Sequence, residues 1–158
     1  MSWDQWHEYG IGFDTALVEA KKIRSFILKH KETIKKNIKS DPYNTGRRDA
    51  ALDKMLEYLK QTTKLDRDDI DEYADKLWDR GCAGLIAMII IEETGITVYA
   101  PGLTDESEDY VLFSAAYPWR YNEKERHLTE DSLIAILEPY ADELGVEVED
   151  DVDLIYAG

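Results

Sequence analysis

Hydrophobic residues recur at helical spacing from the second ten residues of the chain onward. This spacing predicts a helix that begins near Asp14, with Asp14 or Thr15 as its N-cap, and that ends in the turn-forming segment 40–46. Lysines occupy much of its polar side. Its hydrophobic face is expected to consist of Ile23, Phe26, Ile27, Ile34 and Ile38.

Two shorter helices are predicted next, each with its own apolar stripe. The first runs from about Arg47 to Gln61, and the second from about Asp66 or Arg67 to Asp79. The early acids of the second helix suit the positive end of a helix dipole. The stripe of the first helix comprises Ala51, Leu52, Met55, Leu56 and Leu59. The stripe of the second helix comprises Ile70, Tyr73, Ala74, Leu77 and Trp78.

The segment from Cys82 to Gly95 is apolar on nearly every side. A helix on the surface of a domain would show a polar face, so this segment is expected to be a central buried helix that ends at Gly95. A buried strand is the competing interpretation, because the isoleucines of the segment are equally compatible with a sheet.

Patterns typical of strands occur at both ends of the chain and after the central segment. The aromatic segment 3–13, interrupted by two glycines, is expected to be an extended arm or a short edge strand. Segments 96–100 and 110–117 are expected to pair as an antiparallel hairpin, followed by a loop over 118–123.

The last predicted helix has the clearest start in the chain. Thr129 is its expected N-cap, acids occupy the first turn, and Gly145 ends it. One or two short strands are expected in 146–149 and 152–156. The whole pattern predicts a single α+β domain over residues 1–158, in which N-terminal helices precede a small, mostly antiparallel sheet packed against the central buried helix and a C-terminal helix.

The composition fits a folded domain outside any membrane. Hydrophobic residues make up 44% of the 158 residues, which argues against disorder. The N-terminus lacks the pattern of a signal peptide, and the longest apolar run, from Leu85 to Ile91, is much shorter than the roughly 18 residues that a membrane span requires. The sequence therefore predicts a cytoplasmic protein that does not bind membranes.

The formal charge of −15 is unevenly distributed along the chain. Residues 1–64 contain thirteen Lys/Arg and nine Asp/Glu and form a basic helical front with a net charge of +4. Residues 65–158 contain six Lys/Arg and twenty-five Asp/Glu and form an acidic α+β body with a net charge of −19. Such asymmetry favours an interaction role over uniform surface solvation, which remains an alternative explanation.

The acidic body indicates what kind of partner to expect. It would repel phosphates, so direct nucleic-acid binding through the body is not expected. It would attract a basic or nucleic-acid-binding protein, whose Lys/Arg groove the exposed acids could occupy in place of DNA or RNA. Alternatively, the acids could complement the basic first helix within the chain, or a homo-oligomer could assemble through the front helices.

No motif for catalysis, a metal or a cofactor is apparent. Cys82 lies among apolar residues and is expected to be a core residue rather than a nucleophile. The three histidines, His7, His30 and His127, have no spacing typical of metal ligands. The acids around Asp66 to Glu72 lack the ligand spacing and the glycine of a calcium loop. We therefore expect no catalytic residue, metal site or cofactor.

The hypothesis that best fits these observations is a non-enzymatic, acidic interaction protein. It could inhibit a host or defence nucleic-acid-binding protein by mimicking nucleic acid. Aromatic and arginine residues are frequent at binding hot spots, so one loop adds two candidates to the acids. The predicted partner-binding residues are Asp105, Glu106, Glu108, Asp109, Trp119, Arg120, Glu147, Glu149, Asp150 and Asp151. The rival hypothesis is a ligand-binding or enzymatic domain with a pocket near Tyr99, Trp119 and His127.

Several short motifs suggest a family. These are Tyr9–Phe13, Ala83–Ile86, Glu93–Ile96, Tyr117–Trp119 and Leu128–Glu130. In this arrangement the chain resembles small uncharacterised acidic proteins of gram-positive bacteria and their prophages or mobile elements. The resemblance implies a context of mobile elements, whose small proteins often act on host defence or replication machinery, and it implies no catalytic residues.

Overall fold

The computed structural model describes residues 5–61, 63–102, 109–114 and 121–157. Within these ranges the protein has an α+β fold of seven helices and one antiparallel sheet of three strands, and the first half is mostly helical, as the sequence predicts. The elements in chain order are β1 (Gln5–Asp14), α1 (Ala20–Lys29), α2 (Lys31–Ser40), α3 (Arg47–Leu59), α4 (Arg67–Asp75), α5 (Gly81–Thr94), β2 (Tyr110–Ser114), α6 (Glu123–Arg126), α7 (Glu130–Leu144) and β3 (Glu149–Ala157).

The N-terminal strand β1 lies at the centre of the sheet, whose strand order is β2-β1-β3. The expectation of an edge strand was therefore wrong, because both neighbours of β1 come from distant parts of the chain. β1 pairs with β2 from Gly10 to Asp14 and with β3 over most of its length. A Cβ at Gly12 would lie 2.0 Å from the carbonyl oxygen of Val111, so this close strand pairing requires glycine.

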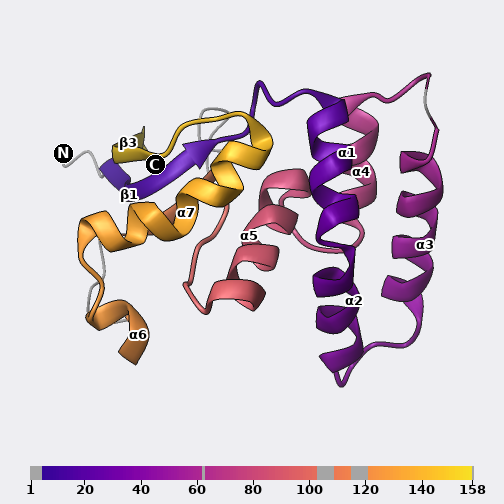
Figure 1. Ribbon diagram of the computed structural model, residues 1–158, viewed down its shortest axis with the longest axis horizontal. Helices are drawn as coiled ribbons and strands as arrows, with labels where there is room; N and C mark the ends of the chain where they lie inside the picture. Colours follow the sequence, from indigo (N-terminus) through magenta and orange to yellow (C-terminus); the bar gives the residue numbers. More distant parts are fainter. Residues whose placement is uncertain (1–4, 62, 103–108, 115–120, 158) are drawn as a thin grey trace.

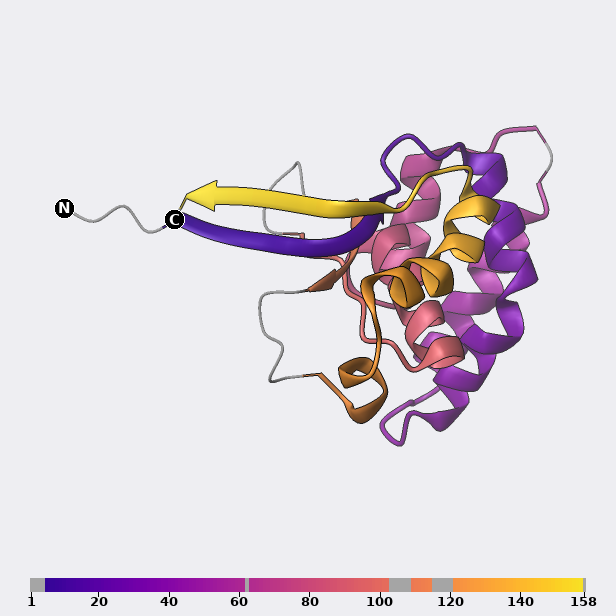
Figure 2. The ribbon, with the colours of Figure 1, turned by 60° about the vertical axis from the view of Figure 1, so that its left-hand side comes forward.

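The sheet extends beyond the helices at one end. Figure 2 shows β1 and β3 running side by side away from the helical part of the molecule. The helices α1 to α4 lie together at the opposite end, and α7 crosses the space between them and the sheet (Figure 1). The two ends of the molecule therefore differ in kind, one being a narrow ribbon of strands and the other a group of helices.

Helix α5 is the centre of the core, as its uniformly apolar sequence predicts. Every residue from Cys82 to Ile90 is buried, and α5 packs against α4, α2 and β2. The competing interpretation of this segment as a strand was wrong. Gly84 allows its tight start, since a Cβ there would lie 1.7 Å from the carbonyl oxygen of Asp79. Within the described ranges, no helix has the length and apolar character needed to cross a membrane.

The first predicted helix is two helices, α1 and α2, and it starts six residues later than expected. Asp14 ends β1, and Thr15 begins a turn because its backbone N–H and its hydroxyl both donate to the carbonyl oxygen of Asp109. The helical path breaks at His30, which has φ −102° and ψ 15°. The expected apolar face is confirmed, since all five of its residues are buried.

Helices α3 and α4 are confirmed, with one change to the stripe of α4. Asp66 caps α4 by accepting a hydrogen bond from the backbone of Asp68, but the helix ends at Asp75, before the expected limit. Trp78 follows in a turn and is 38% exposed, so it does not belong to the buried stripe. Its ring lies 5.5 Å from the guanidinium carbon of Arg48.

The expected hairpin of segments 96–100 and 110–117 is reduced to one bridge, between Tyr99 and Leu112. The second segment is strand β2 as far as Ser114, but its ladder partner is β1. The loop expected over 118–123 gives way at Glu123 to α6, whose N-terminus is a capping box of Asn122 and Glu125. The end of the predicted strand and the start of the predicted loop, residues 115–120, lie outside the described residues.

Helix α7 begins and ends where the sequence predicts. The Thr129 hydroxyl accepts a hydrogen bond from the backbone of Ser132 at 3.1 Å, and Gly145 ends the helix with φ 74°. The expected final strands are one strand, β3, which starts at Glu149. Residues 146–148 precede it outside the ladder.

The basic front and the acidic body of the sequence are interleaved in space. β1 belongs to the front but lies between β2 and β3, which belong to the body. α4 belongs to the body but packs against α3 of the front. The acidic side chains therefore reach both ends of the molecule, and their location has to be established element by element.

Candidate functional site

Helix α4 and the turn after it carry a row of exposed carboxylates, which we call the α4 acidic stripe: Asp68, Glu72, Asp75 and Asp79. The spacings of four and three residues place the three members within α4 on one face, at steps of about 6 and 4.5 Å along the helix axis. The side chains of Asp68, Glu72 and Asp79 make no ion pair or hydrogen bond within the described part of the chain. They are therefore free to attract a cation.

The α4 acidic stripe borders a cleft of about 610 Å³. The lining contains five carboxylates and one cation, Arg80, whose guanidinium donates to the carbonyl oxygen of Gly102. This imbalance makes the cleft a region of negative potential. The cleft is lined by Asp71, Glu72, Asp75, Asp79, Arg80, Gly81, Gly102 and Asp109.

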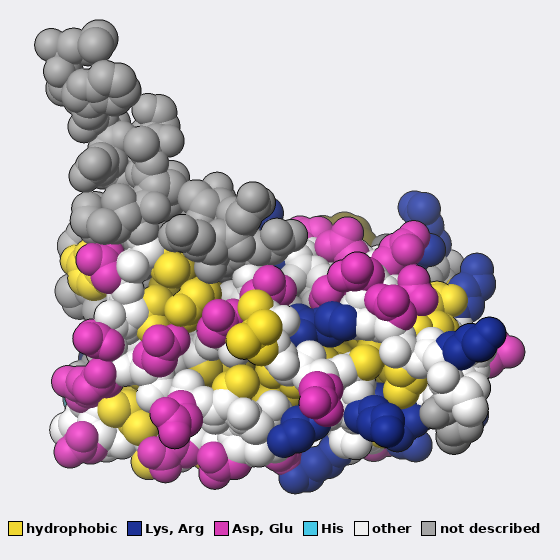
Figure 3. Space-filling model, turned by 90° about the horizontal axis from the view of Figure 1, so that it is seen from above, with side chains coloured by type: hydrophobic (Ala, Val, Ile, Leu, Met, Phe, Trp, Pro, Cys, Tyr) yellow, Lys and Arg dark blue, Asp and Glu magenta, His cyan; other side chains and the backbone are white. Residues whose placement is uncertain are grey.

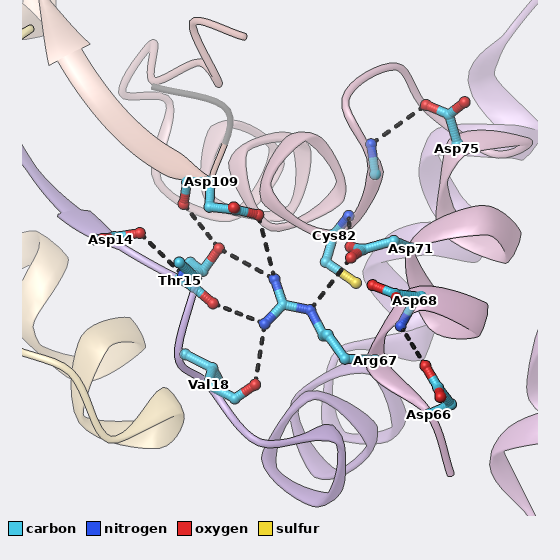
Figure 4. A network of polar contacts seen from close by, with 12 residues as sticks. Asp14, Thr15, Val18, Asp66, Arg67, Asp68, Asp71, Asp75, Cys82 and Asp109 are labelled. Atoms are coloured by element: carbon cyan, nitrogen blue, oxygen red, sulfur yellow. Dashed lines mark hydrogen bonds and ion pairs between the residues drawn. The ribbon is translucent and has the colours of Figure 1, made fainter. Parts of the chain in front are cut away.

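Two of these carboxylates also hold the start of α5, as Figure 4 shows. Asp71 accepts a hydrogen bond from the backbone N–H of Cys82 at 3.1 Å, and Asp75 accepts one from that of Gly81 at 3.3 Å. Both N–H groups belong to the first turn of a helix, which has no partners for them and favours nearby negative charge. Asp71 and Asp75 therefore have a structural role beside any binding role.

Arg67 joins the wall of this cleft to the turn that follows β1 (Figure 4). Its guanidinium donates to the carbonyl oxygens of Thr15 and Val18 at 2.7 and 2.9 Å. It also lies 3.5 Å from a carboxylate oxygen of Asp71 and 3.6 Å from one of Asp109. Asp109, a predicted binding residue, is thus tied into the fold.

A second group of carboxylates lies at and just before β3. We call these residues the β3 acidic edge: Glu147, Glu149, Asp150, Asp151 and Asp153, all of them exposed. β3 is an outer strand of the sheet within the described residues. Acids on an outer strand also discourage edge-to-edge aggregation, which is an alternative reason for their presence.

A groove of about 550 Å³ lies beside the β3 acidic edge. It combines carboxylates with apolar surface and with the ring of Tyr9, which is 44% exposed. Such a lining suits a side chain that has both a cationic head and an apolar stem, as Lys and Arg have. The groove is lined by Tyr9, Gly10, Ile11, Glu130, Asp150, Asp151, Val152 and Asp153.

The predicted binding residues fall into three groups. Glu147, Glu149, Asp150 and Asp151 are brought together at the β3 acidic edge. Asp109 lies instead in the cleft beside α4. The others, Asp105, Glu106, Glu108, Trp119 and Arg120, lie outside the described residues.

The sequence interpretation did not include the α4 acidic stripe among the binding residues. It explained the acids at the start of this helix by the helix dipole alone. The signal that identifies the stripe is the repeated spacing of four, three and four residues from Asp68 to Asp79, which continues past the first turn.

The rival pocket involves two residues that the structure describes. Tyr99 is half-buried and packs against the small apolar cluster of Leu112, Val152 and Leu154. His127 is exposed and follows α6 as its C-cap. Neither residue lines the cleft beside α4 or the groove beside β3.

The buried side chain of His30 lies between two partly exposed carboxylates. Its Nδ1 is 2.8 Å from an oxygen of Glu93, near the end of α5, and its Nε2 is 2.7 Å from an oxygen of Glu143, near the end of α7. The His30 side chain is only 10% exposed, and its ring contacts Phe26 at a centroid distance of 4.5 Å. No local sequence pattern predicts this cluster, since Glu93 and Glu143 lie 63 and 113 residues from His30.

The carboxylates around His30 are surrounded by donors. Tyr140 and Thr33 donate to Glu93, and Lys29 donates to Glu143. Burial alone would raise the pKa of Glu93, but hydrogen bonds from Thr33, His30 and Tyr140 together hold that pKa below its ordinary value. For Glu143, hydrogen bonds from Lys29 and His30 likewise outweigh burial and lower the pKa. Burial, together with the hydrogen bond to Glu93, raises the pKa of Tyr140.

Cys82 is buried in the core, as expected. Burial, followed by the negative charge of Asp71, raises the pKa of its thiol well above the ordinary value. A thiol with a raised pKa is a poor nucleophile at neutral pH. In the described part of the chain, no group of three His, Cys, Asp or Glu side chains is arranged to hold a metal ion.

The surface charge is divided between regions. Figure 3 shows acidic side chains over the end of the molecule where α7 and the sheet lie, and a second acidic group over the helical end. Lys and Arg side chains lie over the middle and right of the same face. Among the described residues, Lys29–Glu143 is the ion pair between a lysine of α1 or α2 and an acid of the body.

Comparison with known proteins adds no relative. Neither a family model, nor a curated protein, nor a solved structure matches the chain. The interpretation of the acidic surfaces therefore depends on their own geometry and charge.

Proposed function

We propose that this protein is a non-enzymatic, acidic interaction protein that binds a basic or nucleic-acid-binding protein. The observation that carries the proposal is the concentration of exposed carboxylates on the α4 acidic stripe and the β3 acidic edge. Carboxylates of this kind attract a cationic surface and accelerate its association. The partner surface would be a Lys/Arg groove of the kind that nucleic acids occupy.

The spacing on α4 supports the finer proposal of nucleic-acid mimicry. Carboxylates about 4.5–6 Å apart along the helix axis have a spacing on the same scale as the phosphates of one DNA strand, which follow one another at about 3.4 Å along the duplex axis. A Lys/Arg groove that binds a row of phosphates could therefore bind the α4 acidic stripe. The resemblance to proteins of prophages and mobile elements would make a host or defence protein the target.

Affinity capture from a lysate of the source cells tests the proposal. The immobilised protein is expected to retain a basic, nucleic-acid-binding protein at low salt and to release it at moderate salt, because salt screens exposed charges. Retention of no such protein, or of a partner that is indifferent to salt, would contradict the proposal. Light scattering of the purified protein across the same salt range would reveal assembly through the front helices instead.

Neutral variants show which surface binds. One variant carries Asp68→Asn, Glu72→Gln and Asp79→Asn, and a second carries Glu147→Gln, Asp150→Asn and Asp151→Asn. The matched control removes three exposed carboxylates elsewhere, with Asp53→Asn, Glu57→Gln and Glu138→Gln. Because all three variants change the net charge equally, equal binding by all of them would show that only total charge matters and that neither surface is the binding site.

A further inference from the structure

The hydrogen bonds around His30 determine which protonation state the site accommodates. An ionised carboxylate only accepts hydrogen bonds, and each ring nitrogen of His30 faces a carboxylate oxygen at 2.7–2.8 Å. A neutral imidazole has one N–H and one bare nitrogen, so one of these contacts would set two lone pairs against each other. Only a ring with a proton on both nitrogens satisfies both contacts.

The neighbouring groups leave both carboxylates ionised. The charged and titratable side chains around the His30 ring are the two carboxylates, Glu93 from α5 and Glu143 from α7, and their neighbours Lys29 from α1 and Tyr140 from α7. The α2 residue Thr33 adds a hydroxyl donor to Glu93. Lys29, Tyr140 and Thr33 all donate to these carboxylates, and none of the three accepts a proton from them. The proton that both contacts require therefore belongs to His30.

His30 also lies where three elements of the fold meet. It is the residue at which the α1–α2 path breaks, and its two partners belong to the last turns of α5 and α7. A single charged ring thus connects three separate parts of the chain. Its ring further contacts Phe26 and Tyr140, at centroid distances of 4.5 and 5.8 Å, which fixes its position between the carboxylates.

We propose that His30 is a proton-dependent clamp: when both ring nitrogens are protonated it ties the α1–α2 junction to α5 and α7, and when one proton is lost the end of α7 is released. The charge of histidine changes in the physiological pH range, which makes it suited to such a switch. After deprotonation, Glu93 and Glu143 would flank a neutral ring, with Lys29 as the cation that remains beside them. The clamp would operate whether or not the acidic surfaces bind a partner.

Nitrogen-15 NMR of the histidine rings tests the protonation state directly. In the folded protein at pH 6, the His30 ring is expected to show two protonated nitrogens, and these signals should change to those of a neutral ring as the pH rises. A neutral His30 ring at pH 6, or a ring that stays charged to pH 10, would overturn the proposal.

Hydrogen exchange tests the release of α7. Above the pH at which His30 loses its proton, the protection factors of amides in the last turn of α7 are expected to fall about tenfold, since the hydrogen bond between the charged ring and Glu143 is lost. In a His30→Gln variant, protection should be low at every pH and should show no such step. His127→Gln, at an exposed histidine, should keep the step. A step that persists in His30→Gln would overturn the proposal.

Discussion

Arg67 shows how much of this fold depends on single polar side chains. Although its side chain is only 18% exposed, it contacts two carbonyl oxygens after β1 and the carboxylates of Asp71 and Asp109. The planar guanidinium supplies donors in several directions at once, which the ammonium of a lysine cannot do. Arg67 therefore fixes the exit of β1, the entry of β2 and helix α4 with respect to one another.

Replacing Arg67 should strongly destabilise the protein. Arg67→Met is expected to lower the free energy of unfolding by about 2 kcal/mol, because two carbonyl oxygens lose a charged donor and the partly exposed carboxylates of Asp71 and Asp109 lose their counter-charge. Arg67→Lys should recover part of the loss. Urea denaturation measures both variants, with Lys64→Met, at an exposed cation, as the control that should change stability by less than about 0.5 kcal/mol. A loss for Arg67→Met no larger than that of the control would show that Arg67 does not hold these segments together.

Cys82 should be unreactive in the folded protein. Burial raises the pKa of its thiol, so little thiolate is present at pH 8, and the surrounding core excludes reagents. A chromogenic disulfide reagent is expected to react with Cys82 slowly in buffer and rapidly in denaturant. Equally rapid reaction in both conditions would mean that the thiol is accessible, and would reopen the question of a nucleophile.

At the scale of elements, the sequence predicts what is determined locally. Helices α3 and α7 follow from apolar periodicity, α5 follows from its uniformly apolar sequence, and end signals such as Thr129 and Gly145 act within a few residues. The central place of β1 could not be predicted, because its neighbours are β2 and β3, roughly 100 and 140 residues later in the chain. Helix α6 has only four residues and so no period, although Asn122 and Glu125 have capping-box spacing.

The start of α7 offers a test of a locally encoded element. Thr129→Ala removes the hydroxyl that accepts from the backbone of Ser132, and should lower the free energy of unfolding by about 1 kcal/mol. Thr129→Ser keeps the hydroxyl and should retain most of the stability. Thermal or urea denaturation of the two variants makes the comparison. Equal losses in both would show that the hydroxyl is not what stabilises this end of α7.

At the scale of the whole molecule, the distribution of charge along the sequence differs from its distribution over the folded surface. The sequence divides into a basic front and an acidic body, but the fold interleaves them and concentrates exposed carboxylates on α4 and at β3. Four of the five acids of the β3 acidic edge could be predicted as one group, because Glu147, Glu149, Asp150 and Asp151 lie within five residues of sequence. The cleft beside α4 could not be predicted, because Gly102 and Asp109 reach it from beyond α5.

The His30 cluster is the clearest limit of sequence reasoning in this protein. Its carboxylates, Glu93 and Glu143, lie on helices that only the tertiary fold brings to the α1–α2 junction.

Because hydrogen bonds lower the pKa of both carboxylates, their contribution to stability is present above their ordinary pKa and is lost as the pH falls through the lowered values. In Glu93→Gln the free energy of unfolding should accordingly be lower at neutral pH, and the acid limb of the stability–pH curve should be shallower, because one titrating carboxylate is gone. An unchanged acid limb would contradict this assignment.

The most direct test of the central claim is competition for the captured partner. The partner is first bound to labelled duplex DNA, and the acidic protein is then added while a gel-shift assay follows the complex. The unmodified protein is expected to displace the DNA, and the variant with Asp68→Asn, Glu72→Gln and Asp79→Asn should need a much higher concentration than the matched control variant. If the partner stays on the DNA at every concentration, or if all variants compete equally, the acidic surfaces do not act as a nucleic-acid mimic.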